Sequence, residues 1–134
     1  MKKRTYIFDS FAVIAYLQAE PGGQKVRELL KKSEAGEISI LMSAINLGEI
    51  IYIIERKLGR NTADTILQDI SKLPLQLIEA TMARVLSAAH IKAQYAISYA
   101  DAFVVALSQE RKGIIVTADP EFKQIEPLID ILWL

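Results

Sequence analysis

The chain has 134 residues, close to the commonest size of a single domain, and 51% of them are hydrophobic, enough for a packed core. Sixteen basic and sixteen acidic residues cancel, so net charge provides no long-range attraction to nucleic acid, and any polyanion needs a local patch or a metal. The absence of cysteine excludes disulfides, thiolate catalysis and metal sites with cysteine ligands.

Short apolar runs alternate with helical patterns along the chain. In chain order we expect a strand at 5–8, helices at 10–18 and 24–35, a strand at 38–42, helices at 44–58 and 61–73, a strand at 75–78, helices at 81–93 and 98–112, and strands at 114–117 and 129–132. Strands that alternate with helices indicate the α/β class, with a central, mainly parallel sheet of about five short strands and helices on both faces. Because no linker or repeat interrupts the pattern, residues 1–134 are expected to form a single domain.

Four acidic residues lie at or just after expected helix starts. Asp9 and Asp119 directly follow expected strands, while Glu49 and Asp101 lie in helices that a doubly wound sheet would point toward the same edge. Ligands of open parallel sheets gather beyond the carboxyl ends of the strands, where the strand order reverses. We therefore expect these carboxylates at the ligand-binding edge.

Each acid also has a purely structural explanation. Asp9 suits an N-cap, Asp101 a first helical turn, and Asp119 a cap before a proline at the first helical position. Asn46 and Glu49 have the spacing of a capping-box variant. Converging carboxylates, however, repel one another unless a cation intervenes. Oxygen ligands with no cysteine and a single histidine favour Mg²⁺ or Mn²⁺ over zinc or copper.

Four short segments resemble the acidic motifs of PIN-domain ribonucleases, and most of all those of the VapC toxins of bacterial and archaeal toxin–antitoxin pairs. They are FDS at 8–10, the Ser43…Asn46…Glu49 segment, SYADA at 98–102, and TADPEF at 117–122. Each motif alone is unspecific, but the ordered set, its spacing and the chain length match over essentially the whole chain.

The resemblance implies a PIN-like domain that hydrolyses RNA phosphodiester bonds with a metal-activated water, leaving a 5′-phosphate and a 3′-hydroxyl. It implies that Asp9, Glu49, Asp101 and Asp119 are catalytic and surround one or two Mg²⁺ or Mn²⁺ ions. Asp9 would be the central ligand, with Asp101 and Asp119 beside it and Glu49 binding through water.

The resemblance further assigns supporting roles to small polar residues. Ser10 and Thr117 match positions that help to place the metal ligands or the phosphate, and Asn46 belongs with them. Local backbone capping explains Ser10 and Thr117 about equally well. Glu121 also lies near the four acids in sequence. It could be an acid just outside the metal ligands or a solvated glutamate of a first helical turn, and we favour the second.

The run IIYII at 50–54 is apolar on every face of a helix, so part of it should meet another surface. A homodimer, an antitoxin helix and burial between helices of the same chain all remain open, and the resemblance implies the first two together with an RNA substrate. The alternative function is a non-catalytic PIN-fold interaction module whose acids serve as helix caps.

No uncharged run is long enough to span a bilayer, and the basic N-terminus lacks a convincing signal-peptide cleavage site. We therefore expect a cytoplasmic protein without a membrane segment.

Overall fold

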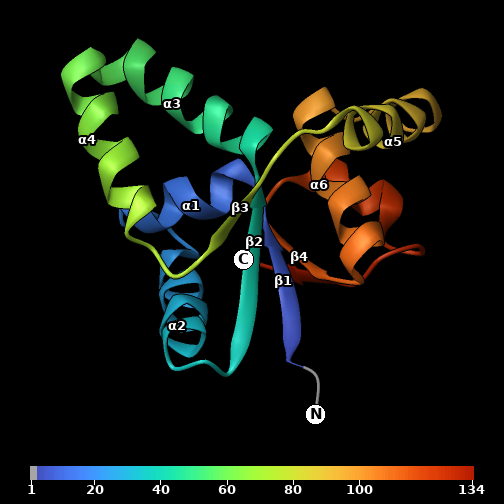
Figure 1. Ribbon diagram of the computed structural model, residues 1–134, viewed down its shortest axis with the longest axis horizontal. Coiled ribbons are helices and arrows are strands. Elements are labelled where there is room, and N and C mark those ends of the chain that lie inside the picture. The colour runs from blue at the N-terminus through green and yellow to red at the C-terminus, as the bar shows by residue number, and fades with distance from the viewer. Residues whose placement is uncertain (1–2) are drawn as a thin grey trace.

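A computed structural model describes residues 3–134 and contains five strands and six α-helices with one short 3₁₀ helix (Figure 1). In chain order the elements are β1 (Arg4–Phe8), α1 (Ser10–Leu17), α2 (Gly23–Glu34), β2 (Ile38–Ser43), α3 (Ala44–Leu58), α4 (Arg60–Ser71), β3 (Gln76–Ile78), α5 (Met82–Gln94), α6 (Tyr99–Arg111), β4 (Ile114–Thr117), η1 (Pro120–Ile125) and β5 (Ile131–Trp133). The expected α/β class and the expected order of strands and helices are confirmed.

All five strands are parallel and lie in the order β3-β2-β1-β4-β5. The chain builds outward from β1 in one direction, through β2 and β3, and then returns to place β4 on the other side. The strand order therefore reverses between β1 and β4, which pair with Phe8 opposite Val116. The residues that follow these two strands emerge side by side at the carboxyl edge of the sheet.

Helices cover both faces of the sheet, as Figure 1 shows, with α1 to α4 on one side and α5 and α6 on the other. Successive side chains of a strand point to opposite faces of the sheet and so belong to two separate cores. In β1, Tyr6 and Phe8 pack with α1 to α4, whereas Ile7 packs with α5, α6 and η1. This two-residue period is the reason that the central strands are apolar throughout.

The apolar run at 50–54 is mostly covered within the chain. Ile50 and Ile54 are fully buried, and Ile51 and Ile53 are half-buried against the same core, where α3 packs on α4. Tyr52 is 49% exposed and is the part of this run left open to solvent. Burial between helices of the same chain thus accounts for most of the run.

Within residues 3–134, no helix combines the length and apolar character that crossing a bilayer requires.

Candidate active site

Asp9 occupies the junction between β1 and α1 and is completely buried. Its Oδ1 accepts a hydrogen bond of 2.8 Å from the backbone N–H of Ala12, so it is the N-cap of α1, as its structural explanation requires. Its Oδ2 accepts a hydrogen bond from the hydroxyl of Thr117, which ends the neighbouring strand β4. One carboxylate therefore both begins a helix and joins the two central strands.

Burial raises the pKa of Asp9 from 3.8 to about 7. The hydrogen bonds from Thr117 and Ala12 oppose this change, and the negative charges of Asp119 and Glu49 add to it. The Thr117 hydroxyl also accepts the backbone N–H of Asp119 at 2.9 Å, so one hydroxyl contacts both Asp9 and Asp119.

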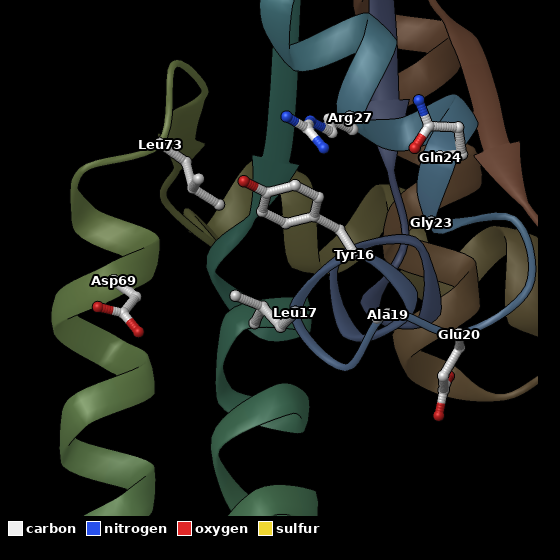
Figure 2. A pocket seen from close by; sticks show the side chains of 9 residues that line it. All are labelled: Tyr16, Leu17, Ala19, Glu20, Gly23, Gln24, Arg27, Asp69 and Leu73. Atoms are coloured by element: carbon white, nitrogen blue, oxygen red, sulfur yellow. The ribbon is translucent and has the colours of Figure 1, made fainter.

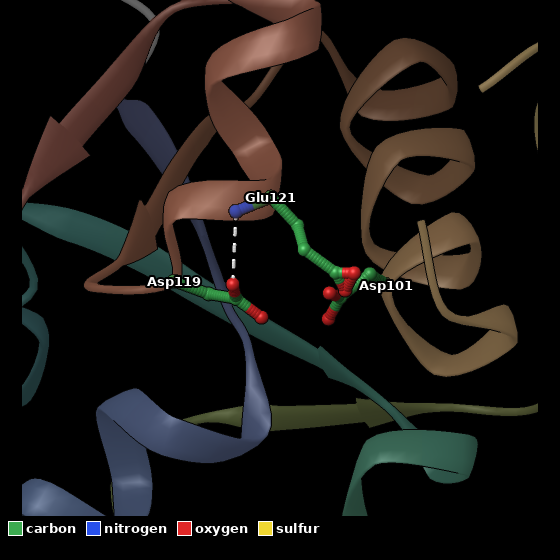
Figure 3. A group of neighbouring side chains, drawn as sticks. All are labelled: Asp101, Asp119 and Glu121. Carbon is green, nitrogen blue, oxygen red and sulfur yellow. Dashed lines mark hydrogen bonds between the residues drawn. The ribbon is translucent and has the colours of Figure 1, made fainter. Parts of the chain in front are cut away.

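Three further carboxylates form a tight cluster, with one oxygen of each lying within 4.8 Å of the others: Asp101, Asp119 and Glu121. Asp101 comes from the first turn of α6, whereas the other two come from the segment after β4 (Figure 3). Asp119 Oδ1 accepts a 2.9 Å hydrogen bond from the backbone N–H of Glu121, and in Figure 3 the Glu121 side chain extends toward Asp101.

Glu121 lies in the first turn of η1, as expected, and it is also the third member of the cluster. Glu121 is only partly exposed, and it joins the cluster because the η1 turn folds back over Asp119. The available sequence signal was its position two residues after a cap acid, which by itself does not distinguish a site residue from a surface one.

Burial also raises the pKa of Asp101, to about 8, with the adjacent carboxyl group of Asp119 as the next cause. The charges of Asp9 and Glu121 act in the same direction. The negative charges of the other three acids therefore all oppose the ionisation of Asp101.

Glu49 belongs to a neighbouring hydrogen-bonded group. The Ser10 hydroxyl bonds to Glu49 Oε1, and Ser10 Oγ lies 3.2 Å from Asn46 Nδ2, which donates to it. The N-cap of α3 is Ser43, whose hydroxyl accepts from the N–H of Ile45 at 3.2 Å, so the capping-box explanation for Asn46 and Glu49 does not hold. The side chain of Glu49 is instead directed across to α1.

The donor set suits a hard divalent cation. Among the described residues, no ion pair involves the acids of the site; the ion pairs join Arg60 to nearby acids, and Arg84 and Arg111 to Glu110. Among residues 3–134, Asn46 Oδ1 is a buried acceptor without a hydrogen-bond partner. The group that holds Glu49 therefore contains an oxygen whose hydrogen-bonding capacity is unused. Closely spaced, uncompensated carboxylates are the ligands that Mg²⁺ and Mn²⁺ prefer.

A separate hollow of about 610 Å³ lies between α1, α2 and α4 (Figure 2). Its lining includes Tyr16, Arg27 and Asp69 but none of the clustered acids. This hollow is large enough for a small ligand, but it lacks the clustered carboxylates found where β1 and β4 end.

The family model for the PIN domain matches residues 6–127. DNA-bound VapBC from Salmonella typhimurium has a similar fold (18% identity, TM-score 0.74), and the match covers 96% of this chain and 97% of that one. VapBC2 from Rickettsia felis, bound to a fragment of its promoter, is also similar (17% identity, TM-score 0.73), with 96% of this chain and 97% of that one covered. A third similar structure is VapC20 from Mycobacterium tuberculosis, a toxin that cleaves the sarcin–ricin loop (16% identity, TM-score 0.69). That match covers 89% of this chain and 93% of VapC20. No curated protein sequence matches the chain. With the family model spanning most of the sequence and the same fold in each of these structures, the chain belongs to the PIN-domain family.

Proposed function

We propose that the protein is a Mg²⁺- or Mn²⁺-dependent endoribonuclease and the toxin of a VapBC-type toxin–antitoxin pair. The observation that carries this proposal is the convergence of Asp9, Asp101, Asp119 and Glu121 from three distant segments on one edge of the sheet. Burial and mutual repulsion make ionisation of Asp9 and Asp101 costly, and a fold tolerates that cost more readily when a cation offsets it.

Asp101, Asp119 and Glu121 would hold the ion, because their oxygens already lie within 4.8 Å of one another. Asp9 would complete the set from the junction between β1 and α1, and Glu49 would act through an intervening water. When bound, such an ion supplies an acidified water and stabilises the charge that develops on the phosphate. The side chains contribute orientation, since their carboxylates fix where the ion and hence the phosphate can lie.

Supporting residues would keep these carboxylates in place. Thr117 holds Asp9 through its hydroxyl, and Ser10 bonds to Glu49 while accepting from Asn46. All three supporting side chains are buried, which restricts their rotamers. They are positioning residues in this proposal and do not touch the substrate.

The structural neighbours support the toxin assignment, because they include a toxin–antitoxin complex from Klebsiella pneumoniae (15% identity, TM-score 0.65) and VapBC-5 from Mycobacterium tuberculosis, a member of the VapBC family of toxin–antitoxin systems (13% identity, TM-score 0.65). We propose that this chain likewise pairs with an antitoxin, dimerises and acts on cytoplasmic RNA. With equal numbers of acidic and basic residues, it would bind bulk RNA weakly and depend on a structured target.

The decisive experiment is cleavage of total RNA by the purified protein in Mg²⁺, in Mn²⁺ and in EDTA. Asp9→Asn and Asp119→Asn should abolish the metal-dependent cleavage, whereas Asp130→Asn, an exposed acid outside the site, should cleave like the wild type. Equal cleavage by all four proteins, or cleavage that persists in EDTA, would contradict the assignment.

The toxin role needs its own test. Induced expression should arrest growth, and Asp9→Asn should relieve the arrest. If the variant is as toxic as the wild type, toxicity comes from binding alone and the proposed chemistry is not its cause.

A further inference from the structure

A second hollow, of about 360 Å³, opens directly beside the acidic cluster. Its walls come from the start of α1, the turn before α2, the segment after β4 and the last residue of the chain, and they include Phe11, Glu20, Pro21, Asp119, Pro120 and Leu134. Asp119 belongs both to this hollow and to the acidic cluster, so the two sites share a wall. A molecule held at the cluster would therefore lie next to the hollow, on the other side of Asp119.

Phe11 is the aromatic wall of this hollow. It is the second residue of α1, where the helix start holds Asp9 inward, and yet its own side chain is 46% exposed. Leaving about half of a large aromatic side chain in water forgoes part of the free energy that its burial would contribute. An exposed ring beside a candidate active site is thus a surface on which a flat ligand could stack.

The hollow rests on a well-defined backbone. Leu134 donates its N–H to the Thr117 carbonyl at 2.9 Å, which ties the chain end to β4. Gly22 adopts a φ of +90°, and a Cβ at that position would lie 2.9 Å from the Leu134 Cβ, so the turn after Pro21 packs tightly against Leu134. The walls are therefore formed before any ligand arrives, which lowers the entropic cost of binding.

Charge decides which part of an RNA could enter. The two charged side chains of the lining, Glu20 and Asp119, are both acidic, and the rest of the lining is apolar. A phosphate would be repelled from such a hollow, whereas a neutral, planar base would bury its faces against a ring and proline side chains. Bases splayed out of single-stranded RNA are recognised in this way, by stacking on aromatic side chains.

We propose that this hollow is a nucleobase subsite, in which the base adjoining the cleaved phosphate stacks on Phe11. This inference takes its ligand, RNA, from the ribonuclease activity proposed above. The hollow and its lining residues are observed independently of that proposal. Stacking tolerates any base, so Phe11 sets affinity for a flipped-out nucleotide and not the identity of that nucleotide.

The test combines binding with cleavage. Single-stranded RNA oligonucleotides carrying 2-aminopurine at successive positions are titrated with protein in Ca²⁺, and the same RNAs are cleaved in Mg²⁺. Wild type is compared with Phe11→Ala, with Phe11→Leu, which keeps an apolar side chain but removes the ring, and with Phe11→Trp, which keeps a ring. Tyr52→Ala is the control, because Tyr52 is similarly exposed (49%) but lies on α3 outside the hollow.

We expect one 2-aminopurine position to be quenched on binding, and expect Phe11→Ala and Phe11→Leu to lose that quench. Their KM should rise about ten- to hundredfold, with a smaller change in kcat. Phe11→Trp and Tyr52→Ala should stay within about threefold of wild type, a smaller change than the loss of one stacked base. Unchanged quench and KM in Phe11→Ala and Phe11→Leu would overturn the subsite and leave the hollow to a protein partner.

The two proposals fail in different ways. If wild-type protein cleaves no RNA but quenches 2-aminopurine in a Phe11-dependent manner, the nuclease assignment falls and the base subsite stands. If wild-type protein cleaves RNA and the Phe11 variants cleave it equally well with the same KM, the subsite falls and the nuclease stands.

Discussion

Thr117 donates its hydroxyl proton to Asp9, and the same oxygen accepts the backbone N–H of Asp119 at 2.9 Å. One buried hydroxyl thus connects the acid that follows β1 with the acid that follows β4. The link exists because β1 and β4 are adjacent and parallel, so that their carboxyl ends meet.

Thr117→Val should separate this role from packing, because valine keeps the β-branched shape but cannot donate. The loss of a hydrogen bond to a buried carboxylate should lower the free energy of unfolding by about 1–3 kcal/mol. It should also raise the pKa of Asp9 further, since that hydrogen bond now holds it down. Denaturant unfolding measures the first effect, and the acid limb of the cleavage–pH profile, shifted to higher pH, measures the second. Thr117→Ser restores the hydroxyl and should restore both.

The stability of the metal-free protein should fall as the pH rises from about 4 to about 8. The folded-state pKa values of Asp9 and Asp101, about 7 and about 8, lie above the ordinary value of 3.8, so the folded state binds protons more strongly than the unfolded state. The resulting stabilisation is complete below 3.8 and is lost as the pH rises through the folded-state values.

Asp9→Asn checks this directly, because the amide keeps the shape and cannot ionise. For Asp9, the difference between the folded-state pKa of about 7 and the ordinary value of 3.8 corresponds to a free energy of unfolding of at most about 4 kcal/mol. In EDTA at pH 8 the variant should therefore be more stable than wild type by up to this amount, and at pH 4 the two should be alike. A variant less stable than wild type at pH 8 would show that the Asp9 carboxylate is ionised without penalty.

Much of the fold could be predicted from sequence because local signals and burial agree. The helix expected at 44–58 has the same bounds in the structure, since Ser43 caps its start and Gly59 ends it. The last strand was expected at 129–132 and lies at Ile131–Trp133, because Ile129 still belongs to the turn after η1. A short apolar run provides no signal for its own register.

The candidate site was only partly predictable for a related reason. Asp9, Asp101 and Asp119 stand at helix starts that an α/β chain brings to one edge, so sequence spacing located them. The bond between Thr117 and Asp9 depends on strand order, and the closeness of Glu121 to Asp101 depends on a 3₁₀ turn. Neither follows from residue types alone.

Glu121 provides the sharpest test of the cation site. Mn²⁺ should stabilise the wild-type protein in a saturable way, because an ion that binds only the folded state adds RT ln(1 + [L]/Kd) to its stability. Glu121→Gln should weaken binding, and a tenfold loss of affinity reduces the stabilisation by about 1.4 kcal/mol. Glu126→Gln is the matched control, since Glu126 follows η1 and lies outside the cluster. Equal Mn²⁺-induced shifts in melting temperature for both variants would remove Glu121 from the site.

Two glycines should respond to alanine in opposite directions. Gly23 begins α2, and a Cβ there would lie 2.5 Å from the carbonyl oxygen of Ala15, so Gly23→Ala must displace backbone and should cost about 1–3 kcal/mol. Gly48 lies exposed in the interior of α3 with nothing within 4 Å of a built Cβ, so Gly48→Ala should stabilise the protein by about 1 kcal/mol. Denaturant unfolding with an unchanged m-value would measure both, and a destabilised Gly48→Ala would mean that the start of α3 is less regular than its hydrogen bonds indicate.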